Sequence, residues 1–195
     1  ITGTKGKTTA AFMLQSIIKA AGESCGMIGS VSTDDGIECY ESTNTTPEAP
    51  EVWRHIANCR ESGRQSMVME VSSQALKYQR VENLPFDVAC FLNIGRDHIS
   101  PIEHPTFEDY FESKLRIFDQ AKTAVVNLGT EEVDRVLEAA STAERLVTVG
   151  VEHPEASLWA SDVRMVGFNI EFNLHGLCAD ESEAGEGPAG HRGRL

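Results

Sequence analysis

The sequence predicts an α/β fold in which a mostly parallel sheet is flanked by helices. Two observations predict it. Short apolar runs of the kind that form buried parallel strands, such as SMVMEVSS and FDVACFLNI, alternate with segments of helical periodicity. The chain also opens on a glycine-rich loop followed directly by a helical segment, which is how such folds place a phosphate-binding loop. The length of 195 residues suits one domain with a substantial core.

Helices are predicted where apolar residues recur every three or four positions and proline or glycine marks an end. The first follows the opening loop, with apolar residues from Ala10 to Ala21 and Gly22 at its end. The second carries Pro47 near its start and Gly63 at its end. The remaining helical segments are SQALKYQRV, TFEDYFESKLRIFDQAK and TEEVDRVLEAAS.

Strands are predicted between these helices, at GMIGSVST, IECYEST, SMVMEVSS, FDVACFLNI, TAVVNL and RLVTVG. From about Val151 the pattern changes to alternating residues, which predicts β-hairpin strands. Residues 179–195 have almost no apolar content, so we expect them to be disordered or to lie outside the fold.

Composition excludes several classes of protein. A net charge of −13 and a pI near 4.8 argue against a general nucleic-acid binder, because nothing would neutralise phosphates along a surface. Five cysteines without metal-ligand spacing suggest free thiols in a reducing compartment. No apolar run approaches the roughly 20 residues that span a bilayer.

The opening TGTKGKTT has the residues of a phosphate-binding loop. Its glycines let backbone N–H groups turn toward phosphate oxygens, Lys7 supplies a positive charge, and the Thr8 hydroxyl can bind Mg²⁺. Ile1 stands where the full motif has its first glycine. The alternative interpretation is a glycine-rich turn that caps a helix.

Lys114 is placed unexpectedly. On a helix it lies near the middle of an apolar stripe, with Glu108 and Glu112 on the opposite face. A lysine in that position either extends its ammonium group to water or is a buried amine of lowered pKa. The first alternative is the ordinary one. The second would allow the amine to pair with phosphate or to be chemically modified.

Polar residues follow the ends of two predicted strands. Glu70 ends MVMEVSS, and Asp97 and His98 follow FDVACFLNI. Because ligands bind at the carboxyl edge of α/β sheets, these side chains are candidates for binding Mg²⁺ or orienting a substrate. The alternative for Asp97 and His98 is a polar surface loop. The other histidines are predicted to be structural or surface residues.

Five ordered motifs resemble the Mur ligase family of ATP-dependent amide-forming enzymes of bacterial cell-wall synthesis. They are TGTKGKTT, STNTTPE, MEVSSQAL, NIGRDHISPIEHPTFEDYFESKLRIF and AVVNL, and they cover most of residues 1–150. NTTPE, EVSSQAL and DYFESK most resemble the MurE branch, which adds the third peptide residue to UDP-N-acetylmuramoyl-dipeptide.

The resemblance implies a three-domain parent enzyme. We expect residues 1–178 to be its central ATP-binding domain without the first strand, with the N-terminal UDP-binding and C-terminal amino-acid-binding domains outside this chain. On that expectation the isolated chain would not complete amide synthesis. The resemblance also implies a cytoplasmic location, with UDP-N-acetylmuramoyl-dipeptide and an amino acid as partners.

The resemblance further implies a role for each matching residue. ATP phosphates would be bound by Gly3, Thr4, Gly6, Lys7 and Thr8. Thr8 and Glu70 would hold one Mg²⁺, while His98 and a carbamylated Lys114 would hold a second. Lys7, Lys114 and His98 would be catalytic. The sugar-nucleotide peptide would contact Thr45, Thr46, Ser72 and Arg80.

The implied reaction has two steps. The substrate carboxylate attacks the γ-phosphate of ATP to give an acyl phosphate and ADP, and the incoming amine then displaces phosphate. Two other interpretations stay open. One is a related ligase of the folylpolyglutamate or cyanophycin type, against which NTTPE and EVSSQAL argue; the other is a non-catalytic nucleotide-binding domain.

Overall fold

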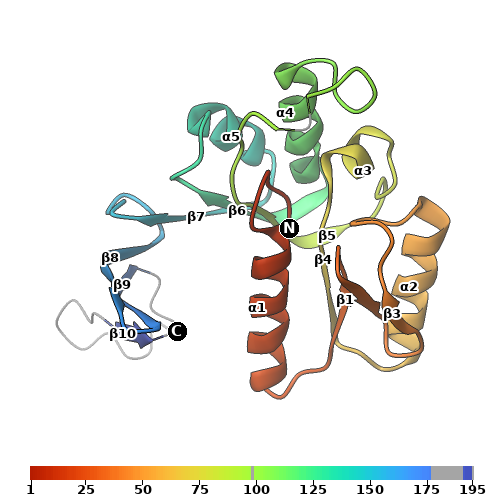
Figure 1. The fold of residues 1–195 in the computed structure, drawn as a ribbon, viewed down its shortest axis with the longest axis horizontal. Helices are drawn as coiled ribbons and strands as arrows, with labels where there is room; N and C mark the ends of the chain where they lie inside the picture. The colour runs from red at the N-terminus through yellow and green to blue at the C-terminus, as the bar shows by residue number, and fades with distance from the viewer. Residues whose placement is uncertain (98, 177–190, 195) are drawn as a thin grey trace.

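The computed structural model describes residues 1–97, 99–176 and 191–194 and has the predicted α/β architecture (Figure 1). The helices are α1 (Lys7–Ala20), α2 (Ala49–Glu61), α3 (Ser73–Lys77), α4 (Phe107–Leu115), the 3-10 helix η1 (Arg116–Gln120) and α5 (Val133–Ala140). The strands are β1 (Cys25–Ile28), β2 (Ser32–Asp34), β3 (Cys39–Glu41), β4 (Ser66–Met69), β5 (Phe86–Phe91), β6 (Ala121–Asn127), β7 (Arg145–Val151), β8 (Leu158–Val166), β9 (Asn169–Gly176) and β10 (His191–Arg194).

The strands form two sheets, of order β3-β2-β1-β4 and β10-β9-β8-β7-β6-β5. Pairing is parallel between β1 and β4 and from β5 through β8, and antiparallel toward the outer edges. The predicted parallel arrangement therefore describes the centre. Helices connect β5 to β6 and β6 to β7, whereas residues 152–157 connect β7 to β8 without a helix. The edges are hairpins because short turns link β2 to β3 and β8 to β9. The hairpin of β8 and β9 confirms the prediction of β-hairpin strands after about Val151.

The first two residues lie between the two sheets. Ile1 accepts a hydrogen bond from Val71 N at 2.8 Å, on the β4 side. On the β5 side, Thr2 N donates to Cys90 O at 2.8 Å and Thr2 O accepts from Leu92 N at 3.0 Å. The segment that leads into the glycine-rich loop is thereby held by backbone hydrogen bonds on both sides.

Helices cover both faces of the central strands. Consecutive residues of β4 show this directly, since Val68 packs in the small cluster under α1 and Met69 packs in the main core. The main core combines the apolar sides of α4, η1 and α5, with Phe91 and Phe118 stacked at 6.1 Å.

Two predictions about element extents need correction. A continuous helix was expected through TFEDYFESKLRIFDQAK, but α4 ends at Leu115 and continues as 3-10 helix, because the chain must tighten before entering β6 at Ala121. Residues 179–195 were expected to have no fold, yet within that range the structure describes His191–Arg194 as β10, paired antiparallel with β9. That pairing uses backbone groups and therefore does not need apolar side chains. The remainder of 179–195 lies outside the described residues.

No helix in the described ranges is long and apolar enough to cross a membrane. Among the described cysteines, Cys25, Cys39, Cys59 and Cys90 are free thiols, as predicted.

Candidate nucleotide and metal site

The glycine-rich loop turns from the segment between the sheets into the start of α1. Gly6 caps this helix with φ of 84°, in the left-handed region that favours glycine. The loop is clamped to the chain after β5, because Lys5 N donates to Asn93 Oδ1 and Asn93 Nδ2 donates to Lys5 O, each at 3.0 Å. The backbone N–H groups at the start of α1 are therefore held at the carboxyl edge of the sheet, where an anion is favoured.

Two lysines converge on this loop. Lys7 Nζ donates to Gly3 O at 3.0 Å, and Lys114 Nζ donates to the same oxygen at 2.9 Å. Burial lowers the pKa of Lys7, although Glu70 and Asp97 partly offset this. Burial, and secondarily the positive charge of Lys7, lowers the pKa of Lys114 to about 7.

The burial of Lys114 decides between the two interpretations of that residue. Its side chain is 1% exposed and its ammonium lies 4.8 Å from the centroid of the Tyr110 ring. The ammonium group does not reach water, so the interpretation in which Lys114 extends its ammonium group to solvent is wrong. Lys114 is a buried amine whose neutral form is accessible near neutral pH.

Glu70 is fully buried next to the phosphate loop, directly after β4. Thr8 Oγ1 donates to Glu70 Oε2 at 2.8 Å, and Ser30 N donates to Glu70 Oε1 at 2.9 Å. Ser30 Oγ lies 3.2 Å from the same carboxylate. Hydroxyl and carboxylate oxygens are the donors that Mg²⁺ prefers, so Thr8 and Glu70 fit such an ion.

The four predicted substrate residues lie around Glu70. Thr46 Oγ1 donates to Glu70 O at 2.9 Å and accepts from Ser72 N at 3.0 Å. Arg80 donates to Thr46 O at 3.0 Å, and Thr45 Oγ1 accepts from Ser30 Oγ at 3.0 Å. Residues separated by up to 35 positions in the sequence thus form one wall beside the carboxylate.

The loop after β5 contacts the phosphate loop as well. Gly95 N donates to Thr4 Oγ1 at 3.0 Å. Asp97 lies close enough to the two lysines to raise the pKa of both. The predicted metal ligand His98 lies outside the described residues.

A protein-family model for the Mur ligase middle domain matches residues 1–185. The chain belongs to the Mur ligase family. It is 41% identical over 180 residues to UDP-N-acetylmuramyl-tripeptide synthetase of Bifidobacterium longum, an alignment that covers 87% of this chain and 35% of that protein. It is 43% identical over 143 residues to UDP-N-acetylmuramoyl-L-alanyl-D-glutamate--L-lysine ligase of Streptococcus suis, covering 73% of this chain and 30% of the relative.

Solved structures agree with this assignment. A UDP-N-acetylmuramoyl-L-alanyl-D-glutamate--2,6-diaminopimelate ligase superposes with a TM-score of 0.80 at 25% identity, over 90% of this chain and 36% of that one. MurF of Thermotoga maritima in complex with ADP has the same fold, with a TM-score of 0.64 at 19% identity, over 90% of this chain and 37% of that one. The chain spans about a third of the length of the relatives it matches.

Three residues of this Mur ligase site were not predicted: Ser30, Asn93 and Tyr110. Ser30 and Asn93 each follow the end of a central strand, so the carboxyl-edge argument that selected Glu70 could have included them. Tyr110 donates its hydroxyl to Thr4 Oγ1 at 3.0 Å across 106 positions of sequence. Its apolar-stripe position predicts burial, but no local signal identifies that partner.

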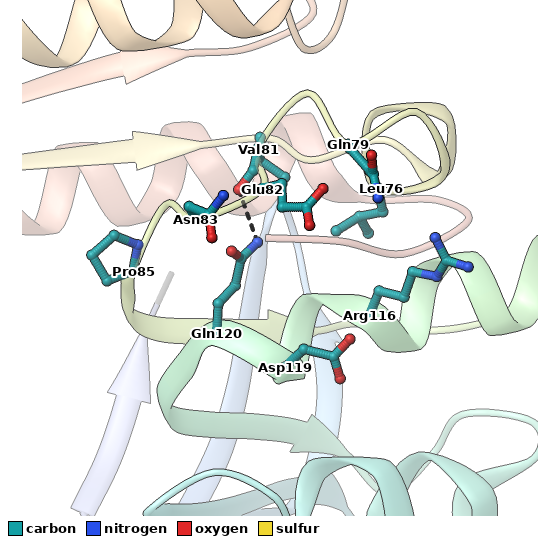
Figure 2. A pocket seen from close by; sticks show the side chains of 9 residues that line it. All are labelled: Leu76, Gln79, Val81, Glu82, Asn83, Pro85, Arg116, Asp119 and Gln120. Carbon is teal, nitrogen blue, oxygen red and sulfur yellow. Dashed lines mark hydrogen bonds between the residues drawn. The ribbon is translucent and has the colours of Figure 1, made fainter.

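A cavity of about 480 Å³ lies at the other end of the Mur ligase sheet (Figure 2). Pro85 and Gln120, which line it, immediately precede the first residues of β5 and β6. Gln120 Nε2 donates to Val81 O across it at 2.9 Å. None of the predicted site residues lines this cavity, so it is distinct from the phosphate loop.

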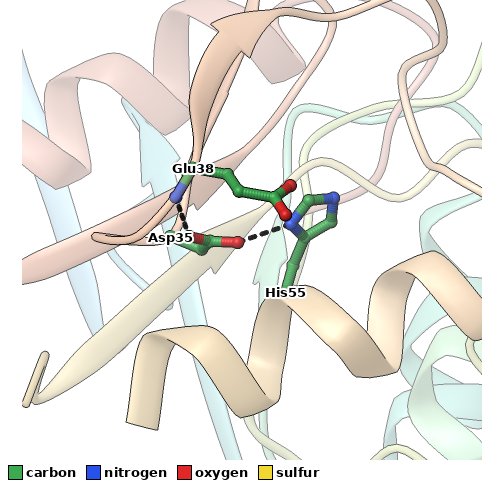
Figure 3. Close-up of side chains that lie close together, drawn as sticks. All are labelled: Asp35, Glu38 and His55. Carbon is green, nitrogen blue, oxygen red and sulfur yellow. Dashed lines mark hydrogen bonds and ion pairs between the residues drawn. The ribbon is translucent and has the colours of Figure 1, made fainter. Parts of the chain in front are cut away.

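Asp35, Glu38 and His55 form a second polar cluster, with one potential metal-ligand atom each within 4.8 Å of the others (Figure 3). His55 Nδ1 lies 2.7 Å from Asp35 Oδ2, and His55 Nε2 lies 2.8 Å from Tyr40 OH. Glu38 pairs with Arg54. Protein groups already occupy these ligand atoms, so the cluster is a hydrogen-bonded connection between the β2–β3 hairpin and α2. His55 is structural, as predicted.

Proposed function

We propose that this chain is the ATP-binding part of a ligase that adds the third amino acid to UDP-N-acetylmuramoyl-dipeptide in the cytoplasm. The observation that carries the proposal is the convergence of Lys7, Lys114 and the Thr8–Glu70 pair on one loop at the carboxyl edge of the sheet. The relatives named as tripeptide synthetase and L-lysine ligase, at 41% and 43% identity, favour this branch over other Mur-type ligases.

The loop would bind the nucleotide phosphates through the N–H groups of Gly3, Thr4 and Gly6 and the start of α1. Lys7 already points at the loop interior, where its bond to Gly3 O would exchange for phosphate oxygens. The positive charge of Lys7 would then offset the repulsion between the attacking carboxylate and the triphosphate.

Thr8 and Glu70 would hold Mg²⁺, and His98 with Lys114 a second one. Bound Mg²⁺ supplies charge neutralisation on the transferring phosphoryl group. Lys114 would serve as a carbamate, formed when its neutral amine attacks CO₂ and releases one proton. Conversion of the lysine to an anion would create a metal ligand where the sequence has placed a buried cation.

The wall formed by Thr45, Thr46, Ser72 and Arg80 would contact the sugar-nucleotide peptide and place its terminal carboxylate in line with the γ-phosphate. Arg80 would contribute its guanidinium, which donates to Thr46 O and pairs with the exposed Glu48 carboxylate at 2.7 Å, so an anionic group of the substrate would have to displace Glu48.

Titration of the chain with Mg²⁺ and ADP tests the nucleotide site. We expect Lys7→Met to weaken binding by at least about tenfold, since one charged hydrogen bond is worth more than 1.4 kcal/mol. Lys5→Met is the matched control, because the Lys5 residue is exposed and only its backbone engages Asn93. Equal affinities for the two variants would remove the phosphate-loop assignment.

The carbamate has an independent test. In ¹³C-bicarbonate at mildly alkaline pH, NMR should detect a carbamate carbon that disappears in Lys114→Met. Retention of the signal in that variant would assign the carbamate to another amine. Its absence from the parent chain would contradict carbamylation of Lys114.

A further inference from the structure

The buried side chain of Tyr110 lies between the phosphate loop, Lys114 and His104. Its hydroxyl donates to Thr4 Oγ1 at 3.0 Å, and its ring lies under the Lys114 ammonium at 4.8 Å. The ring of His104 meets that of Tyr110 edge-on, with centroids 5.2 Å apart. One aromatic residue of α4 therefore contacts Lys114 of the same helix and groups from two other segments, the phosphate loop and the chain before α4.

Thr4 is fixed by this contact. Its Oγ1 accepts from both Tyr110 OH and Gly95 N, each at 3.0 Å, which uses both lone pairs of the hydroxyl oxygen. The Thr4 side chain thus has a single set of partners that spans α4 and the loop after β5. Loss of the Tyr110 bond would leave the Thr4 hydroxyl held only by its hydrogen bond from Gly95 N.

His104 continues the connection to α3. It is fully buried, with Nδ1 2.6 Å from Asp109 Oδ2 and Nε2 2.9 Å from Ser73 Oγ. Asp109 also accepts from Lys77 Nζ at 2.7 Å. Since the Asp109 carboxylate only accepts when ionised, the imidazole Nδ1 carries a proton and the ring orientation is set.

We propose that Tyr110 and His104 are positioning residues that hold the phosphate loop and the start of α3 in one fixed arrangement. The path runs from Ser73 through His104 and Tyr110 to Thr4. It would set the separation between the nucleotide and the substrate wall, whose Ser72 is the N-cap of α3. The effect on nucleotide placement rests on the proposed function, but the hydrogen-bond network itself can be tested without a ligand.

Amide hydrogen exchange of the ligand-free chain is the first measurement. Tyr110→Phe keeps the ring and removes only the hydroxyl, so we expect faster exchange in residues 3–8 with little change elsewhere. Thr4→Val removes the same bond and also the acceptor of Gly95 N, so its effect on residues 3–8 should be at least as large. The double variant should match Thr4→Val, and Thr4→Ser, which retains the oxygen that accepts both bonds, should behave as the parent chain.

Mg²⁺–ADP affinity is the second measurement. Tyr110→Phe should weaken binding by about tenfold, as for loss of one buried hydrogen bond. Thr4→Val, which also loses the Gly95 bond, should weaken it at least as much, and the double variant by no more than Thr4→Val alone. Additive effects, or unchanged exchange in Tyr110→Phe, would overturn the role of Tyr110. Thermal melting identifies any variant that fails to fold, and the two single variants test the bond independently.

His104→Gln tests the α3 half of the network. Faster exchange both at the first amides of α3 and in residues 3–8 is expected. An effect confined to α3 would overturn the connection through His104. If the parent chain itself does not bind Mg²⁺–ADP, the proposed function fails, while the exchange data still decide whether these residues position the loop.

Discussion

Lys7 and Lys114 donate to one oxygen atom, the carbonyl oxygen of Gly3, at 3.0 and 2.9 Å. Two ammonium groups that share an acceptor repel each other, and Lys114 is buried as well. The repulsion and the burial both favour loss of a proton from Lys114, whose pKa is about 7. The phosphate loop thus contains a positive charge and, beside it, an amine that is readily neutral.

The buried amine should make stability depend on pH. The folded pKa of Lys114, about 7, lies below the ordinary lysine pKa of 10.5, so between these pH values the unfolded chain binds the extra proton. The free energy of unfolding should therefore rise with pH across this window, by up to about 1.4 kcal/mol for each unit of pKa difference. Urea unfolding at several pH values between 6 and 10 measures it.

Lys114→Met is the comparison for this prediction. Methionine fills similar space without a charge, so the variant should be the more stable protein near pH 7, and its advantage should shrink as pH rises toward 10.5. A constant difference across that range would show that the amine titrates normally. Lys7→Met should also raise the pKa of Lys114, because Lys7 lowers it.

A side chain at Gly29 should displace the Glu70 carboxylate. A Cβ built there would lie 2.4 Å from Glu70 Oε1, closer than atoms can approach. Gly29→Ala must therefore displace the carboxylate from Thr8 and Ser30, and we expect ADP binding to lose its dependence on Mg²⁺. In Gly129→Ala the new Cβ would meet Asn127 Oδ1 at 3.4 Å, an ordinary contact, so this variant should bind as the parent does. Retained Mg²⁺ dependence in Gly29→Ala would contradict the role of Glu70.

Local patterns were sufficient to predict much of the fold and part of the site. Helical and strand periodicity placed nearly every element, since each segment must bury one side. The apolar stripe placed Lys114 near the centre of a buried helix face, but the pattern favoured an ammonium group that reaches water, and only the packing of the helix shows that the amine is buried. Glu70 could be predicted because parallel strands bring their carboxyl ends to one edge.

Contacts between distant segments could not be predicted. The Tyr110–Thr4 bond joins residues 106 positions apart, and its geometry depends on how α4 packs over the sheet. Likewise the convergence of Lys7 and Lys114 on one oxygen required the orientation of the loop. The change from α-helix to 3-10 helix after Leu115 was also missed, since the apolar pattern continues through both.

Thr46 should contribute to stability beyond its size. Its side chain is 1% exposed, donates to Glu70 O and accepts from Ser72 N. Thr46→Val preserves the shape but leaves two buried backbone groups without partners, each costing about 1–3 kcal/mol. We expect the free energy of unfolding to fall by about 2–4 kcal/mol in urea melts. Thr142→Val, at an exposed hydroxyl, should change it by less than about 0.5 kcal/mol, and equal effects would contradict the argument.

The Asp35 carboxylate should hold the β2–β3 hairpin on α2. It accepts from Ile37 N, Glu38 N and Asn58 Nδ2 at 2.9, 2.7 and 2.9 Å, and lies 2.7 Å from His55 Nδ1. Although burial raises the pKa of Asp35, these hydrogen bonds outweigh the effect of burial and hold the pKa at about 2, below the ordinary aspartate pKa of 3.8. The stabilisation is therefore complete above pH 3.8 and is lost as pH falls toward 2.

Asp35→Asn tests this contribution by replacing one acceptor oxygen with an N–H donor that faces other donors. At pH 7 we expect the free energy of unfolding to fall by about 2–3 kcal/mol, because charged hydrogen bonds are lost and a buried donor is left unpaired. The difference from the parent should shrink between pH 4 and pH 2, where the parent carboxylate takes up its proton. Asp87→Asn, at an exposed ion pair with Lys122, should have little effect at any pH. A deficit in Asp35→Asn that does not depend on pH would mean that packing, rather than the charge of Asp35, holds the hairpin in place.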